Sequence, residues 1–121
     1  MNRVTVYTLK NCRTCRDAVK WLAARGVEFD EKPIRETPPG LAELRTMLAG
    51  QKSEIRRLFN SSGLEYRVLG LAQKMPLMTA VEALRLLAGN GSLVKRPFLL
   101  GPGVALVGFD PAAWSLALGR G

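Results

Sequence analysis

The chain has 121 residues, of which 18 are Lys or Arg and 10 are Asp or Glu, and its formal net charge is +8. A chain of this length can bury one hydrophobic core, so we expect a single domain over residues 1–121. Charged residues interrupt every long apolar segment, which argues against a membrane span. Residues 1–4 lack the apolar core of a signal peptide, and we therefore expect a cytoplasmic protein.

The positive charge is dispersed along the chain. Basic residues are adjacent only in Arg56-Arg57 and Lys95-Arg96. A nucleic-acid surface usually gathers its Lys and Arg residues into a patch or stripe. We therefore expect a basic surface without a direct nucleic-acid site.

The N-terminal third predicts a strand, a helix and a second strand. Val4 to Thr8 is rich in β-branched and aromatic residues, as strands are. Asp17 to Arg25 has helical periodicity, and Gly26 is placed to end that helix. The second strand is expected from Val27 to Ile34. Crossover connections are right-handed and join parallel strands, so we expect this pair to be parallel.

The middle of the chain predicts a helical insert at about residues 38–91. The segment Thr37-Pro38-Pro39-Gly40 breaks the chain before it. Leu41 to Leu48 has helical spacing, and Ser53 is expected to cap a short helix that ends at Phe59. Thr79 is expected to cap a longer helix, whose inward-facing residues would be Val81, Leu84, Leu87 and Ala88.

The C-terminal part predicts a β-hairpin and a closing helix. Leu93 to Leu100 and Val104 to Phe109 are apolar runs on either side of Gly101-Pro102-Gly103. Asp110 and Pro111 are typical of a helix start. The expected fold is α/β with a thioredoxin-like mixed sheet, in the order β-α-β, helical insert, β-β-α.

The only two cysteines, Cys12 and Cys15, lie between the first strand and the first helix. Cys-x-x-Cys in this place is typical of a thioredoxin-like redox site, because residues three apart on a helix share a face. A helix N-terminus stabilises an anion, and nearby cations do the same. The cations near this motif are Lys10, Arg13, Arg16 and Lys20. The sequence therefore predicts a reactive Cys12 thiolate and a resolving Cys15.

Three other interpretations of the cysteine pair stay open. Zinc usually has four ligands, and the chain offers two cysteines and no histidine, so we expect no metal site. A structural disulfide would close too short a loop to constrain the unfolded chain much. Two inert buried thiols are the strongest alternative, since free cysteines are often buried.

Four segments resemble the arsenate reductase-like ArsC/Spx family. The first is the Val-Tyr-Thr strand (residues 6–8) that leads to Cys12-x-x-Cys15-Arg16. The others are Arg57-Leu58-Phe59-Asn60-Ser61-Ser62-Gly63, then Val94-Lys95-Arg96-Pro97-Phe98-Leu99, and last Leu106-Val107-Gly108-Phe109. They cover most of the chain in the family order. The match is specific at the level of the family and does not settle the subfamily.

The resemblance implies a role for several residues. The family's arsenate reductases have their nucleophile at the position of Cys12 and hold the oxyanion with three arginines. Arg96 matches one of these arginines, whereas Asn60 and Gly108 stand at the other two positions. Spx-type regulators carry the second cysteine found here as Cys15. They use the pair as a redox switch and bind the C-terminal domain of the RNA polymerase α-subunit.

The predicted site combines these arguments. Cys12, Cys15 and Arg96 are the expected catalytic residues, and the expected substrate contacts are Asn11, Arg16, Asn60 and Pro97. In a thioredoxin-like sheet the position of Pro97 faces the cysteines, typically after a cis bond. We expect a thiol-dependent reductase or redox switch without a cofactor. Its partners would be a thiol donor (thioredoxin, glutaredoxin or glutathione) or RNA polymerase.

Overall fold

A mixed four-stranded sheet forms one half of the molecule in the computed structural model, which describes residues 3–119. The strands are β1 (Val4–Thr8), β2 (Phe29–Pro33), β3 (Phe98–Gly101) and β4 (Val104–Val107), in the order β2-β1-β3-β4. β1 and β2 are parallel, whereas β3 is antiparallel to both β1 and β4. The predicted thioredoxin-like order β-α-β, insert, β-β-α is confirmed.

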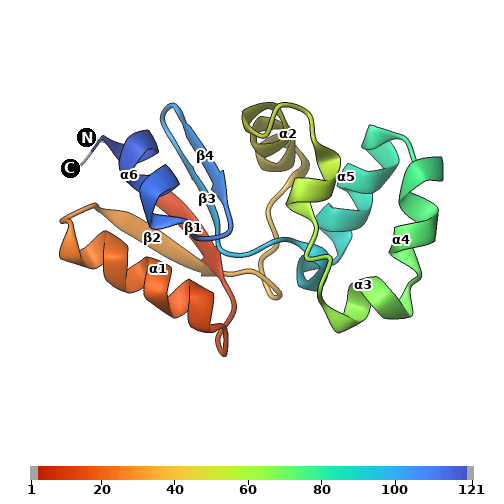
Figure 1. Cartoon of the computed structure of the whole chain (residues 1–121), viewed down its shortest axis with the longest axis horizontal. Coiled ribbons are helices and arrows are strands. Elements are labelled where there is room, and N and C mark those ends of the chain that lie inside the picture. The colour runs from red at the N-terminus through yellow and green to blue at the C-terminus, as the bar shows by residue number, and fades with distance from the viewer. Residues whose placement is uncertain (1–2, 120–121) are drawn as a thin grey trace.

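Two helices cover one face of this sheet, and the insert lies on the opposite side (Figure 1). α1 (Arg13–Ala24) connects β1 to β2, and α6 (Pro111–Leu118) follows β4. Between β2 and β3 the chain forms α2 (Leu41–Gly50), η1 (Ile55–Leu58), α3 (Leu64–Val68), α4 (Leu71–Lys74), η2 (Met75–Leu77), α5 (Ala80–Gly89) and η3 (Gly91–Leu93). In the part of the chain that the structure describes, no helix is long and apolar enough to cross a membrane.

Side chains that alternate along the strands supply two cores, one on each face of the sheet. Val6 of β1 pairs with Leu99 of β3, and both are buried with Ala18 and Leu22 of α1 and with Trp114 of α6. On the opposite face, Tyr7 pairs with Phe98, and these two rings meet edge-on at 5.7 Å between centroids. The second core continues from these rings into the insert through Ile34, Leu44, Met47, Leu58, Leu71, Leu87 and Leu93.

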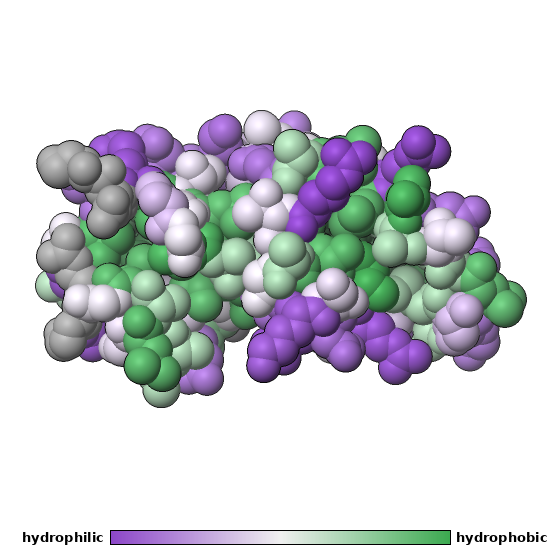
Figure 2. Space-filling view, turned by 90° about the horizontal axis from the view of Figure 1, so that it is seen from above, coloured by the Kyte–Doolittle hydropathy of each residue, from purple (hydrophilic) through white to green (hydrophobic). Residues whose placement is uncertain are grey.

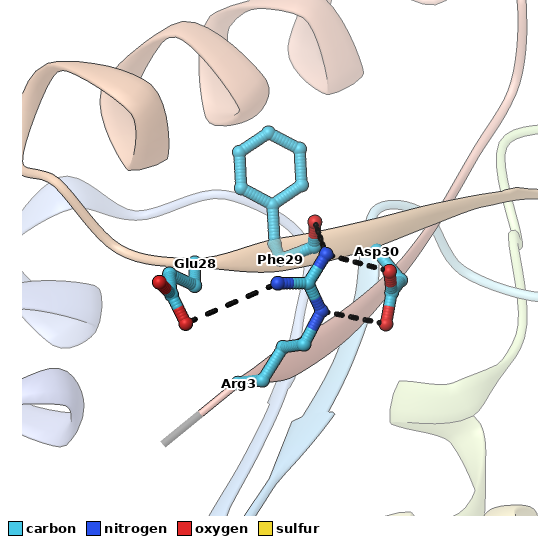
Figure 3. Close-up of polar contacts among 4 residues, drawn as sticks. All are labelled: Arg3, Glu28, Phe29 and Asp30. Carbon is cyan, nitrogen blue, oxygen red and sulfur yellow. Dashed lines mark hydrogen bonds and ion pairs between the residues drawn. The ribbon is translucent and has the colours of Figure 1, made fainter. Parts of the chain in front are cut away.

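Exposed charges hold the outer edge of the parallel pair (Figure 3). The Arg3 guanidinium donates hydrogen bonds to both carboxylate oxygens of Asp30, at 3.0 and 2.9 Å, and lies 3.9 Å from Glu28. The hydrogen bond from Arg3 lowers the pKa of Asp30. Because these groups are exposed, their contribution to stability is small.

A short antiparallel bridge attaches the insert to the segment that enters β3. Phe59 pairs with Val94, the Asn60 N–H donates to the Leu93 carbonyl at 2.7 Å, and the Lys95 N–H donates to Leu58 at 2.8 Å. Two side chains add further links: the Tyr7 hydroxyl donates to Glu43 at 2.7 Å, and buried Gln51 donates to the Ala105 carbonyl at 3.0 Å. The insert is therefore connected to both β1 and β4.

Some element boundaries differ from prediction. The first helix begins at Arg13, four residues earlier than Asp17, because Cys12 acts as its N-cap. Ser53 does not cap a helix; it has a positive φ of 63°, and Glu54 precedes η1. Val81 of α5 is 53% exposed, and Ala83 is buried instead.

Two predicted N-caps in the second half of the chain, Thr79 and Asp110, are confirmed. The Thr79 hydroxyl accepts the Glu82 N–H, and the Asp110 carboxylate accepts the Ala112 N–H. The residues outside the described range are 1–2 and 120–121, which include most of the predicted tail at 119–121.

We predict that Gly91→Ala destabilises the protein, because a Cβ on Gly91 would overlap the Ile34 carbonyl oxygen. Backbone atoms cannot move aside as a flexible side chain can, and overpacking of this kind costs about 1–3 kcal/mol. Urea unfolding followed by circular dichroism measures the loss. The matched control is Gly89→Ala, since nothing lies within 4 Å of a Cβ there and helical alanine is favoured over glycine. Equal stability of the two variants would contradict the prediction.

Candidate functional site

Cys12 is the N-cap residue of α1, and its sulfur caps the helix. Its backbone is extended (φ −105°, ψ 112°), and the Cys15 N–H donates to Cys12 Sγ at 3.3 Å. The backbone on both sides is fixed as well: the Cys12 N–H donates to the Leu9 carbonyl, and the Arg16 N–H donates to the Cys12 carbonyl. A thiolate at this point accepts a hydrogen bond and faces the positive end of the helix dipole.

Cys15 is one turn further along and is buried. Burial raises the pKa of its thiol to about 12, and the hydrogen bond with Cys12 acts in the same direction. Two weaker influences lower the pKa: the Leu9 N–H, which donates to Cys15 Sγ at 3.5 Å, and the charge of Arg96. Cys15 is therefore a protonated thiol near neutral pH.

The two cysteines differ in what they can do chemically. Both are free thiols, but Cys12 is half-buried and Cys15 is fully covered. A substrate therefore reaches Cys12 first, whereas Cys15 lies behind it within reach of the same sulfur. Of the alternatives left open by the sequence, the exposure of Cys12 disfavours two equally inert buried thiols.

The predicted cis peptide bond between Arg96 and Pro97 is confirmed. Pro97 is buried, and Arg96 is half-buried. The Arg96 guanidinium donates from Nη1 to the carbonyls of Ser92 at 3.1 Å and Val94 at 3.4 Å. Its charge also acts on Cys15, whose pKa it lowers. Arg96 is thus held by backbone carbonyls, and its catalytic role stays a prediction.

Three further residues, Asn11, Arg16 and Asn60, are predicted to contact the substrate. Asn11 and Arg16 are exposed on either side of the motif. Asn60 is half-buried in the bridge to Leu93, and its side-chain nitrogen would lie 2.5 Å from a Cβ on Gly63. The Asn60 amide therefore folds over its own turn. Substrate binding by these three residues stays a prediction.

Sequence reasoning missed the backbone of Leu9, which touches both cysteines. Its carbonyl accepts from the Cys12 N–H, and its N–H donates to Cys15 Sγ. A backbone donor carries no signal in the identity of a side chain, so no pattern could have revealed it. Within residues 3–119, no three His, Cys, Asp or Glu side chains come together as metal ligands.

Comparison with known proteins places this geometry in a family. The ArsC family model matches residues 7–116. YusI, an uncharacterised protein of Bacillus subtilis strain 168, is 40% identical over 106 residues, which are 88% of this chain and 90% of YusI. The global transcriptional regulator Spx of Enterococcus faecalis is 26% identical, over 88% of this chain and 80% of Spx.

A solved structure agrees with the sequence match. An ArsC-family-related protein from Bacteroides fragilis superposes with a TM-score of 0.88 and 35% identity, over 94% of this chain and 96% of that protein. The superposition thus covers nearly the whole of both chains. The chain belongs to the ArsC family.

Proposed function

We propose that this protein carries out thiol–disulfide redox chemistry with the pair Cys12 and Cys15. The observation that supports the proposal most directly is the arrangement of the two thiols. The accessible sulfur accepts a helix N-terminal N–H at 3.3 Å, and a buried thiol lies one turn behind it. Such asymmetry is what a nucleophile and a resolving thiol require.

The reaction begins when the Cys12 thiolate attacks one sulfur of a substrate disulfide. A mixed disulfide forms, and the other substrate sulfur leaves as a thiolate. Cys15 then loses its proton and attacks Cys12 Sγ, which releases the second substrate sulfur. The substrate has gained two electrons, and the protein holds a Cys12–Cys15 disulfide. A thiol donor such as thioredoxin, glutaredoxin or glutathione returns it to the dithiol state.

Arg96 has a supporting role in this proposal. A guanidinium near the cysteines favours thiolate over thiol, and its charge offsets a part of the rise in the pKa of Cys15 that burial causes. It also offers an anionic group of the substrate a charged hydrogen-bond donor. The proposed thiol donors keep cysteines reduced in the cytoplasm, and we therefore propose a cytoplasmic location.

A second candidate function is redox-sensing transcription regulation. The similarity to Spx, a global transcriptional regulator, together with the second cysteine, favours it. In this function the Cys12–Cys15 disulfide is itself the signal, and the partner is the C-terminal domain of the RNA polymerase α-subunit. The two candidates share the same oxidised state and differ in whether a substrate is turned over.

We predict that peroxide converts Cys12 and Cys15 into a reversible intramolecular disulfide. Peroxide first oxidises Cys12 to a sulfenic acid, and attack by Cys15 then expels water. Mass spectrometry of the intact protein measures the loss of two hydrogen atoms, which dithiothreitol should restore. Cys15→Ser should abolish the loss and leave Cys12 open to further oxidation. Independent overoxidation of both sulfurs in the unmodified chain would rule out the pair as a redox unit.

Arsenate reduction is expected to be weak or absent. Arg96 is the one arginine of the family's oxyanion triad that is matched, and a planar guanidinium is hard to replace in oxyanion binding. A coupled assay with arsenate and either thioredoxin or glutaredoxin measures turnover, with Cys12→Ser as the blank. Robust turnover that depends on Cys12 would show that other cations of the chain replace the two missing arginines.

The regulator candidate predicts that oxidation changes binding to RNA polymerase. The C-terminal domain of the polymerase α-subunit is purified and immobilised, and retention of the reduced and the peroxide-treated protein is compared. A several-fold difference that disappears in Cys15→Ser supports a regulator. If neither form is retained, the regulator candidate fails, whereas the proposed disulfide chemistry is unaffected.

A further inference from the structure

A small cavity with three basic side chains lies where the insert meets the sheet. It has a volume of about 200 Å³, and its lining residues are Arg56, Arg57, Phe59, Ser61, Lys95 and Val107. Three of the six carry a positive charge, one carries a hydroxyl, and none is acidic. The volume is below the roughly 300–1,000 Å³ typical of sites for drug-sized ligands, so the cavity suits a small ligand or one chemical group of a larger one.

The cations of this cavity are not neutralised by carboxylates. Within residues 3–119, no ion pair joins Arg56, Arg57 or Lys95 to an acidic side chain. Glu54 lines a neighbouring cavity together with Arg57, but the two form no ion pair. Three like charges around one small volume repel one another, and the attraction of an anion between them offsets that repulsion.

Part-buried hydrogen bonds hold the Arg57 side chain of the cavity in place. The Arg57 Nε donates to Gln51 Oε1 at 2.9 Å, and buried Gln51 in turn donates to the β4 carbonyl of Ala105. This arrangement fixes the Arg57 stem while its terminal nitrogens stay available. The Lys95 backbone N–H donates to the Leu58 carbonyl, and the Lys95 side-chain Cε would lie 3.4 Å from a Cβ on Gly108.

The cavity is separate from the cysteine site. Cys12, Cys15 and Arg96 are not among its lining residues. The neighbours Lys95 and Arg96 divide between the two sites, since Lys95 lines the cavity whereas the charge of Arg96 acts on Cys15. An anion bound here would therefore leave the thiols free to react.

We propose that this cavity binds a phosphate-type oxyanion, either as inorganic phosphate or as the phosphoryl group of a small phosphomonoester. Guanidinium groups match the geometry of phosphate oxygens, Lys adds a point charge, and the Ser61 hydroxyl donates a further hydrogen bond. A dianion with several acceptor oxygens uses all of these groups, whereas a carboxylate or chloride uses fewer. The proposal is independent of the redox chemistry proposed above.

The test is a titration of the ¹⁵N-labelled full chain with inorganic phosphate at neutral pH and low salt, followed by NMR. We expect saturable shifts of the Ser61 and Lys95 amides and smaller shifts with acetate. Lys95→Gln and Arg57→Gln should each weaken binding by about tenfold or more, since a charged hydrogen bond is lost, whereas Lys95→Arg should keep most of it. Phenyl phosphate run in parallel distinguishes the two sources: an ester that binds more tightly than phosphate identifies a phosphorylated molecule.

A control variant makes the result specific. Arg85→Gln removes one exposed charge outside the cavity and should leave the affinity unchanged. The proposal is overturned if phosphate does not bind at millimolar concentration. It is also overturned if Arg85→Gln weakens binding as much as Lys95→Gln, or if the shifts appear at Cys12 and Cys15 and disappear with Arg96→Gln.

Discussion

The hydrogen bond from the Cys15 N–H to Cys12 Sγ determines how the two thiols are presented. It places the first sulfur at the start of α1, where free N–H groups favour an anion, and it requires the helix to begin directly after the loop from β1. The same helical turn carries the second sulfur inward, where burial raises its pKa to about 12. One local constraint thus makes Cys12 accessible and keeps Cys15 protonated.

The rest of the fold fixes that loop and also fixes the segment that carries Lys95 and Arg96. Val6 and Tyr7 anchor β1 in the two cores, so the chain leaves the sheet at a fixed point before Leu9. The bridge between Phe59 and Val94 fixes the segment that carries Lys95 and Arg96. Figure 2 shows hydrophilic residues around the half of the molecule that carries the insert, with hydrophobic residues exposed between them. The two proposed sites share the segment with Lys95 and Arg96, and each of these neighbouring cations serves a different proposed site.

Local patterns were enough to predict the order of elements and the cysteine pair. The strand Val4–Thr8, the cap at Thr79 and the start of the last helix at Asp110 all have signals within a few residues. What the sequence left open depends on contacts between distant residues or on the backbone. Gln51, at the end of α2, accepts a hydrogen bond from Arg57 and donates one to Ala105 of β4. The donor to Cys15 Sγ is the main-chain N–H of Leu9. Neither has a pattern in sequence. Cys12 was expected at the helix N-terminus, but the helix itself was predicted to start only at Asp17, because cysteine is not among the usual capping residues.

The asymmetry of the two thiols is tested most directly by their alkylation rates. The reduced protein is treated with iodoacetamide at pH values from about 6 to 10, and each cysteine-containing peptide is quantified by mass spectrometry. Cys12 should react first at every pH, and Cys15 should react slowly, with a rate that still rises at the highest pH because burial raises the pKa of Cys15 to about 12. In Cys12→Ser, Cys15 should stay slow. Equal rates for the two cysteines, or a Cys15 rate that levels off near the ordinary thiol pKa of about 8.5, would contradict the assignment of nucleophile and resolving thiol.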